Sequence, residues 1–208
     1  MNRESDIAVK ASFGHTIRNW FLTQEPQAEC LAVLFPGGDG ICDVPLLHYA
    51  RKVALQLGCD VLSLEYGYVR TEHSLSRDFL ATIIQETGEA VRACQPGKYE
   101  RVCFISKSFG TLVAGAVREQ LGHLPVRSLY LAPLEDTLAY LSKESCAVVM
   151  GDKDKHFPDV GKLSELPGVR LHVFRDAGHS LEIRDDYKRS LEMLGEVAEI
   201  CERFIRGE

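Results

Sequence analysis

The sequence has no surplus of basic residues and no long hydrophobic segment. Lysine and arginine total 24 against 30 aspartates and glutamates, and the formal net charge is −6. Proteins that bind nucleic acids usually carry a basic surplus. No apolar run approaches the roughly 20 residues of a membrane-spanning helix, and residues 1–15 contain no apolar segment typical of a signal peptide. We therefore expect neither a nucleic-acid partner nor a membrane partner.

Metal-binding and disulfide spacings are also missing from the sequence. The number of cysteines is seven, which is odd, and none of them forms a C-x-x-C pair. Most lie among apolar residues, as small core residues do. This usage predicts free thiols in a reducing compartment, so we expect a cytoplasmic protein that uses no metal and no cofactor. The cysteines are Cys30, Cys42, Cys59, Cys94, Cys103, Cys146 and Cys201.

Short apolar runs alternate with segments of helical period along nearly the whole chain. Most runs are continuous and rich in Val, Leu and Ile, which is typical of strands buried on both faces of a parallel sheet. Their alternation with amphipathic helices predicts an α/β fold built from right-handed βαβ units. The six runs are Cys30–Phe35, Val61–Leu64, Val102–Ile105, Val126–Leu131, Cys146–Met150 and Val169–Phe174.

The length of 208 residues suggests a single domain over residues 1–208. We expect a mostly parallel sheet of about seven strands with helices on both faces. Residues 6–24 are interpreted as one or two short edge strands, with a hairpin turn at Gly14–His15. In an open parallel sheet, functional residues gather beyond the C-terminal ends of the strands, so a site is expected in the segments that follow the six runs.

Ser108 lies where the chain is expected to turn from the third run into a helical pattern. The chain reads S-K-S-F-G over residues 106–110. A nucleophile on such a turn needs small residues two positions before and after it, because larger side chains collide with the flanking strand and helix. The pentapeptide resembles the nucleophile elbow G-x-S-x-G of the α/β-hydrolase superfamily, with Ser106 in place of the first glycine. Two strand-end serines that cap a helix are the alternative interpretation.

Two later strand ends carry an acid and a histidine in the order of that superfamily, which is serine, acid, histidine. The fifth run is followed by G-D-K-D over residues 151–154, similar to a strand-end G-x-x-D. The resemblance implies that Asp154, rather than Asp152, orients the histidine. The sixth run is followed by a Gly-His pair that ends in His179, where the superfamily places its base. A solvated charged loop and a helix-capping histidine are the alternatives.

A glycine-rich segment, F-P-G-G-D-G over residues 35–40, ends the first run. It resembles the superfamily's oxyanion loop, with Pro36 where many relatives carry histidine. Glycines allow a backbone N–H group to approach the reacting centre closely. The resemblance implies an oxyanion hole made by the N–H groups of Gly38 and Phe109. A plain tight turn remains an alternative, whereas a phosphate-binding loop would need glycine motifs that are missing.

These four segments occupy four strand ends in the expected order, and the resemblance covers nearly the whole chain. It implies an α/β-hydrolase fold and a serine hydrolase that cleaves a carboxylic ester or thioester of a small substrate through an acyl-enzyme on Ser108. His179 would accept the serine proton, and Asp154 would orient the imidazole. Small lidless carboxylesterases and dienelactone-hydrolase-like proteins are similar in size, although dienelactone hydrolases use a cysteine nucleophile.

The segment between the fourth and fifth runs, residues 132–145, is too short for a cap domain.

A non-catalytic member of the same fold, which binds a ligand or partner without turnover, is the alternative function. Another α/β enzyme, such as a nucleotide-binding one, would also need the missing glycine motifs. The acyl group, the leaving group and the oligomeric state stay open at this stage.

Several further residues lie near the predicted site without a motif of their own. Lys107 occupies the variable position of the elbow. Tyr66, Tyr68 and Arg70 follow the second run and would either line a pocket or serve as ordinary residues. Other histidines match no pattern and are expected to have no special role, and these are His48, His73, His123, His156 and His172.

Overall fold

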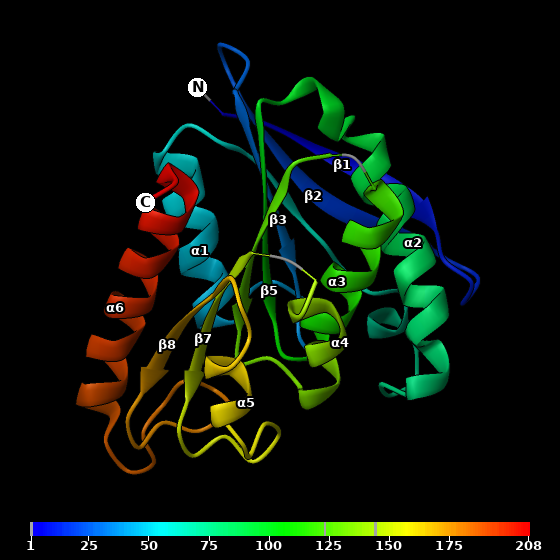
Figure 1. Ribbon diagram of the computed structural model, residues 1–208. Coiled ribbons are helices and arrows are strands. Elements are labelled where there is room, and N and C mark those ends of the chain that lie inside the picture. Colours follow the sequence, from blue (N-terminus) through cyan, green and yellow to red (C-terminus); the bar gives the residue numbers. More distant parts are fainter. Residues whose placement is uncertain (1, 123, 144) are drawn as a thin grey trace.

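An eight-stranded sheet forms the centre of the molecule. The computed structural model describes residues 2–122, 124–143 and 145–208, and the strand order is β1-β2-β4-β3-β5-β6-β7-β8 (Figure 1). Strands β3 to β8 run parallel, whereas β2 is antiparallel to both β1 and β4. The strands are β1 (Asn2–Lys10), β2 (Thr16–Gln24), β3 (Cys30–Phe35), β4 (Asp60–Ser63), β5 (Arg101–Lys107), β6 (Val126–Leu131), β7 (Cys146–Gly151) and β8 (Val169–Phe174).

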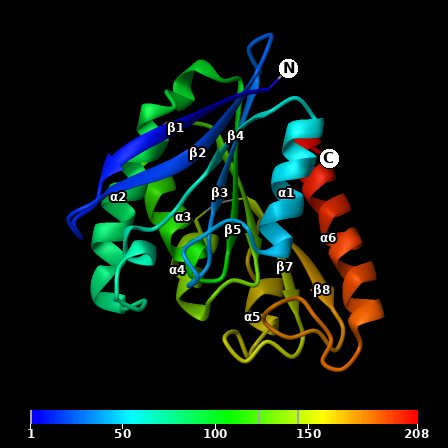
Figure 2. The same cartoon turned by 180° about the vertical axis from the view of Figure 1, so that it is seen from behind.

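Helices cover both faces of this sheet. Figures 1 and 2 show α1 beside α6 on one face, and α2 beside α3 on the other. Two short helices, α4 and α5, and four 3-10 segments, η1 to η4, lie in the connections. The helices are α1 (Pro45–Gln56), α2 (Leu80–Ala93), α3 (Phe109–Leu121), α4 (Leu138–Leu141), α5 (Gly161–Ser164) and α6 (Tyr187–Arg206), and the 3-10 segments are Gly67–Arg70, Arg77–Phe79, Pro96–Lys98 and Glu135–Thr137.

Strand β3 explains why the apolar runs are continuous. All of its residues are buried. Ala32 and Leu34 belong to the core on the side of α1 and α6, whereas Leu31 and Val33 belong to the core on the side of α2 and α3. Because successive side chains of a strand point to opposite faces, a sheet covered on both faces requires apolar residues at every position. All seven cysteines are buried in the core.

The predicted fold class is confirmed, and it differs in detail at the N-terminus. The sheet has eight strands because residues 2–24 form two strands of nine residues each, of which β1 is the edge strand and β2 pairs with both β1 and β4. Between β6 and β7, the described residues form only η4 and α4, so this connection holds no cap domain. The assignment of residues 1–208 to a single domain stays a prediction. His123 lies outside the described residues. Among the described residues, no helix is long and apolar enough to cross a membrane.

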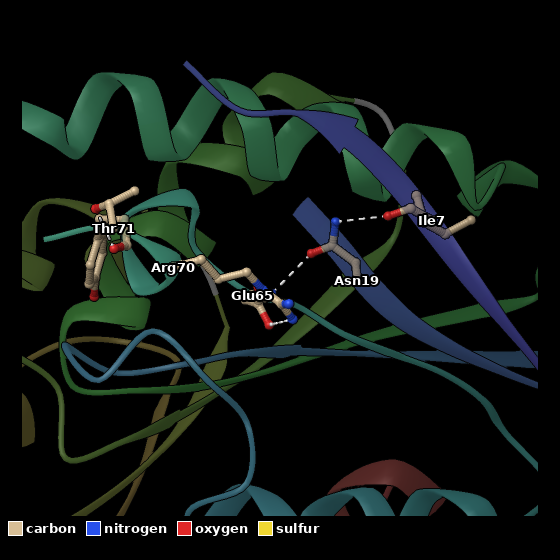
Figure 3. A network of polar contacts seen from close by, with 6 residues as sticks. Ile7, Asn19, Glu65, Arg70 and Thr71 are labelled. Carbon is tan, nitrogen blue, oxygen red and sulfur yellow. Dashed lines mark hydrogen bonds and ion pairs between the residues drawn. The ribbon is translucent and has the colours of Figure 1, made fainter. Parts of the chain in front are cut away.

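A buried asparagine ties the N-terminal hairpin to the segment that follows β4. The Asn19 amide donates to the carbonyl of Ile7 at 3.1 Å, and its oxygen accepts from the N–H of Glu65 at 3.0 Å (Figure 3). Arg70 then forms an ion pair with the carboxylate of Glu65 at 2.6 Å. Asn19 is only 2% exposed, so both of its polar atoms need partners. These bonds hold the segment after β4 in place beside the C-terminal edge of the sheet.

Gly151, the last residue of β7, lies against the loop that follows β8. A β-carbon at this position would lie 2.0 Å from the carbonyl oxygen of Ala177, which is a backbone atom. The two backbones therefore approach more closely than any side chain allows. We expect Gly151→Ala to lower the free energy of unfolding by about 1–3 kcal/mol, as overpacking does, and urea denaturation measures this change.

Gly195 on α6 provides the matched control. A β-carbon there would meet no atom within 4 Å, so Gly195→Ala should raise the stability by roughly 0.5–1 kcal/mol through helix propensity alone. Equal stability of Gly151→Ala and the wild type would show that β7 and the loop after β8 do not touch.

Candidate active site

Ser108 lies at the sharp turn from β5 to α3, in a backbone conformation that is strained for a residue with a side chain. Its φ is 52° and its ψ is −121°, and such conformations cost about 1–3 kcal/mol. Gly110 makes the turn possible, because a β-carbon there would lie 2.3 Å from the carbonyl oxygen of Pro36. The Ser108 N–H donates to the carbonyl of Leu131 at 3.0 Å. The surrounding strands therefore hold the serine at the edge of the sheet.

Ser106, which replaces the first glycine of the motif, belongs to the sheet itself. It is 1% exposed, and its hydroxyl donates to the carbonyl of Leu129 on the neighbouring strand β6 at 3.3 Å. The side chain is small enough to fit between the strands. Ser108, in contrast, lines a cavity beside α3.

A chain of hydrogen bonds joins three residues that are far apart in the sequence. Nε2 of His179 lies 2.7 Å from Oγ of Ser108, and Nδ1 of His179 lies 2.7 Å from Oδ2 of Asp154. A carboxylate only accepts hydrogen bonds, so the proton of a neutral imidazole resides on Nδ1 and leaves Nε2 free to accept from the serine hydroxyl. The structure thus brings together the three residues that the motifs predicted.

The two aspartates of the loop after β7 have different surroundings. The side chain of Asp154 is fully buried, and its second oxygen accepts the N–H of His156 at 2.8 Å. Asp152 is exposed and accepts the N–H of Asp176 at 2.7 Å. Asp152 therefore braces the loop that leads to His179, whereas Asp154 contacts the imidazole itself.

Two buried tyrosines hold the glycine-rich loop after β3. The hydroxyl of Tyr66 donates to the carbonyl of Pro36 at 2.9 Å, and that of Tyr68 donates to the carbonyl of Gly38 at 2.7 Å. A β-carbon on Gly37 would lie 3.5 Å from Cβ of Ser108. The loop is thereby fixed directly against the serine.

One cavity includes the serine, and a second lies beside the residues that adjoin the serine and the histidine in the sequence. The α3 cavity, of about 480 Å³, is lined by Gly38, Ser108 and Phe109 together with apolar side chains such as Leu80 and Leu112. The α6 cavity, of about 760 Å³, lies between the first turns of α1 and α6 and includes Lys107 and residues 180–183. Among the described residues, no group of three or more His, Cys, Asp and Glu side chains could hold a metal ion.

Comparison with known proteins agrees with this architecture. No protein-family model and no curated protein matches the chain. Among solved structures, a serine hydrolase without a lid from Xanthomonas campestris is 17% identical, with a TM-score of 0.68 over 98% of this chain and 95% of the other. A dienelactone hydrolase from Anabaena variabilis is 15% identical, with a TM-score of 0.73 over 99% and 98%. An esterase from Pyrococcus furiosus is 16% identical, with a TM-score of 0.70 over 98% and 92%.

The chain has the α/β-hydrolase fold. The predicted resemblance to lidless serine hydrolases and dienelactone hydrolase is therefore confirmed at the level of the fold. In this α/β-hydrolase fold, Ser108, Asp154 and His179 follow β5, β7 and β8, whose C-terminal ends meet at one edge of the sheet.

Three residues near the site have contacts that the sequence did not indicate. His156, expected to be an ordinary residue, lines the α3 cavity, and its ring lies 4.4 Å from that of His179. Tyr66 and Tyr68 could equally have lined a pocket, but both are buried and bind loop carbonyls. All three lie just beyond strand ends, so position in the α/β fold was the signal that could have found them.

Tyr68 provides a test of the loop geometry through its ionisation. Burial raises the pKa of Tyr68 to about 12, and repulsion by the Asp39 carboxylate adds to the effect. The difference in tyrosinate absorbance between wild type and Tyr68→Phe should therefore have its midpoint near pH 12 rather than about 10.

The same shift affects stability at alkaline pH. A raised pKa in the folded state contributes stability that is complete below the unfolded value of about 10 and is lost as the pH rises to 12. Tyr68→Phe should therefore lose less stability than the wild type over this interval, as thermal unfolding at each pH would measure. A midpoint near pH 10 for the folded protein would mean that Tyr68 is not buried beside Asp39.

Proposed function

We propose that the protein is a serine hydrolase that cleaves a carboxylic ester or thioester of a small substrate through an acyl-enzyme on Ser108. The observation that carries this proposal is the unbroken hydrogen-bonded chain from Ser108 through His179 to Asp154. A serine hydroxyl is a weak nucleophile until a neighbouring base accepts its proton, and His179 is positioned to be that base.

Acylation uses each of these groups once. The Ser108 oxygen bonds to the acyl carbon while its proton moves to Nε2 of His179. We assign the stabilisation of the resulting oxyanion to the backbone N–H groups of Gly38 and Phe109, beside which the serine lies. Asp154 maintains the imidazole tautomer and stabilises the imidazolium. The bond to the leaving group then breaks, and His179 returns its proton to the leaving atom.

Deacylation repeats the same transfers with water. His179 accepts a proton from water as the oxygen of that water bonds to the acyl carbon. The bond between Ser108 and the acyl group then breaks, the proton passes to Ser108, and the carboxylic acid leaves. In both stages a proton passes between His179 and Ser108, whose hydrogen bond is 2.7 Å long, whereas the bond of 2.7 Å to Asp154 only orients the imidazole.

The alternative is a binding protein without turnover. Such a role needs neither a serine in a strained conformation nor a fully buried carboxylate aligned on a histidine. Strain of this kind persists only where the surrounding structure enforces it, and it concentrates at active sites. These two features favour the hydrolase.

The nucleophile can be identified by labelling with a fluorophosphonate, followed by peptide mapping. We expect the adduct on Ser108, and we expect Ser108→Ala to reduce kcat by about 10⁴-fold or more. Ser106→Ala is the matched control, because it removes a hydroxyl that is bonded within the sheet, and it should retain most of the activity. An adduct on Ser106, or full activity in Ser108→Ala, would contradict the assignment of Ser108 as the nucleophile.

The acid can be distinguished by a second pair of variants. Asp154→Asn should reduce kcat by roughly 10⁴-fold, because the imidazole loses its orienting carboxylate. Asp152→Asn should keep kcat within about tenfold while costing roughly 1 kcal/mol of stability, because only the bond to Asp176 weakens. Steady-state kinetics and thermal unfolding of both variants provide the test. The reverse pattern of kcat values would identify Asp152 as the acid.

A further inference from the structure

The α6 cavity begins beside the nucleophile, because Lys107, the residue before Ser108, lines it. A β-carbon on Gly37 would lie 3.5 Å from Cβ of Ser108, 3.7 Å from Nζ of Lys107 and 3.4 Å from Oδ1 of Asp39. Lys107 and Asp39 both line the α6 cavity. One end of this cavity and the serine are therefore both close to the same glycine.

The loop that carries His179 continues into the wall of the same cavity. Residues 180–183, which directly follow His179, line it. In the proposed reaction, His179 gives its proton to the leaving atom, so the leaving group departs from beside this histidine. The α3 cavity instead contains Gly38 and Phe109, whose N–H groups are assigned to the acyl oxygen. The geometry thus separates an acyl side from a leaving-group side.

The walls of the α6 cavity are largely apolar and partly uncovered. Tyr187 is 71% exposed and Leu191 is 62% exposed, although both are large apolar side chains. They line the cavity together with Leu46, Ile183 and Leu194. An uncovered apolar surface next to a reactive group is typical of a ligand-binding groove.

The charges that line this cavity are predominantly negative. The residues that line it include four carboxylates and a single cationic side chain, Lys107. The carboxylates are those of Asp39, Glu182, Asp185 and Asp186. A ligand whose charge has the same sign as that of its binding site binds less tightly, because the two repel each other. An anionic ligand is therefore disfavoured, whereas a neutral apolar one finds complementary walls.

We propose that the α6 cavity binds the leaving group of the substrate, and that this leaving group is bulky, apolar and free of negative charge. The inference rests on the proposed hydrolase function and narrows its substrate class. It favours esters of large neutral alcohols and thioesters of neutral thiols. It disfavours thioesters of coenzyme A, whose thiol carries several phosphate charges.

Two thioesters with the same acyl group test the role of charge. Butyryl-coenzyme A and the butyryl thioester of N-acetylcysteamine share the reacting bond, and only the former carries phosphates. We expect kcat/KM to be at least about tenfold higher for the neutral thioester, and the gap should narrow as salt screens the carboxylates. Equal or better hydrolysis of the coenzyme A thioester would overturn the proposal.

A charge-reversal pair locates the effect in the cavity. Glu182→Lys should lower the ratio of kcat/KM for the neutral thioester to that for the coenzyme A thioester by about fivefold. Glu199→Lys makes the same change of net charge on α6 but lines neither cavity, so it should leave the gap within about twofold of the wild-type value. Similar effects of the two variants would mean that overall charge, and not this cavity, selects the thioester.

Leaving-group size is tested with ethyl butyrate and 2-phenylethyl butyrate. We expect kcat/KM to be about tenfold higher for the phenylethyl ester, because it buries apolar area in the cavity. Leu194→Trp, which fills that space, should abolish the preference, so that kcat/KM for the two esters becomes equal within about twofold. No preference in the wild type would overturn the proposal.

Labelling of Ser108 by the fluorophosphonate separates the two levels of inference. A labelled enzyme that prefers ethyl butyrate or the coenzyme A thioester would refute only the leaving-group assignment. Absence of labelling and of hydrolysis of all four substrates would refute the hydrolase function, and the leaving-group assignment would fall with it.

Discussion

At two points near the site, backbones approach each other more closely than any side chain would permit. Gly110 lies against the end of β3, where a β-carbon would be 2.3 Å from a carbonyl oxygen. Gly151 lies against the loop after β8, where the corresponding distance is 2.0 Å. The first contact holds Ser108 in its strained turn, and the second holds the loop that leads to His179. The bond of 2.7 Å between these residues depends on both contacts.

The loop after β3 depends in turn on residues far from it in the sequence. Tyr66 and Tyr68 bind its carbonyl groups. Asn19 anchors the segment that carries both tyrosines, because it accepts a hydrogen bond from the N–H of Glu65. The antiparallel edge hairpin therefore contributes indirectly to the position of Gly38. Buried and fully bonded polar groups of this kind rigidify a structure, because breaking any bond leaves a partner without water.

In the proposed function, the two cavities would hold the two halves of an ester or thioester. The α3 cavity adjoins the loop and the start of α3, and the α6 cavity adjoins the loop that follows His179. Because no cap domain lies between β6 and β7 in the described chain, the specificity that we propose depends on these loops and on the exposed side chains of α6, such as Leu191.

The sequence by itself determined the fold class and the order of the strands along the chain, because strands buried on both faces must be apolar at every position. It also indicated Ser108, Asp154 and His179, since a tight turn restricts its neighbours to small residues and strand ends restrict where functional groups can lie. It did not show that Ser108 contacts His179 while Ser106 bonds to a neighbouring strand. Nor did it show that His156 lies beside His179, or that Tyr66 and Tyr68 bind the glycine-rich loop. Those facts depend on hydrogen bonds and ring contacts between residues separated by up to 71 positions, and only the packing of strands and helices determines which of these residues meet.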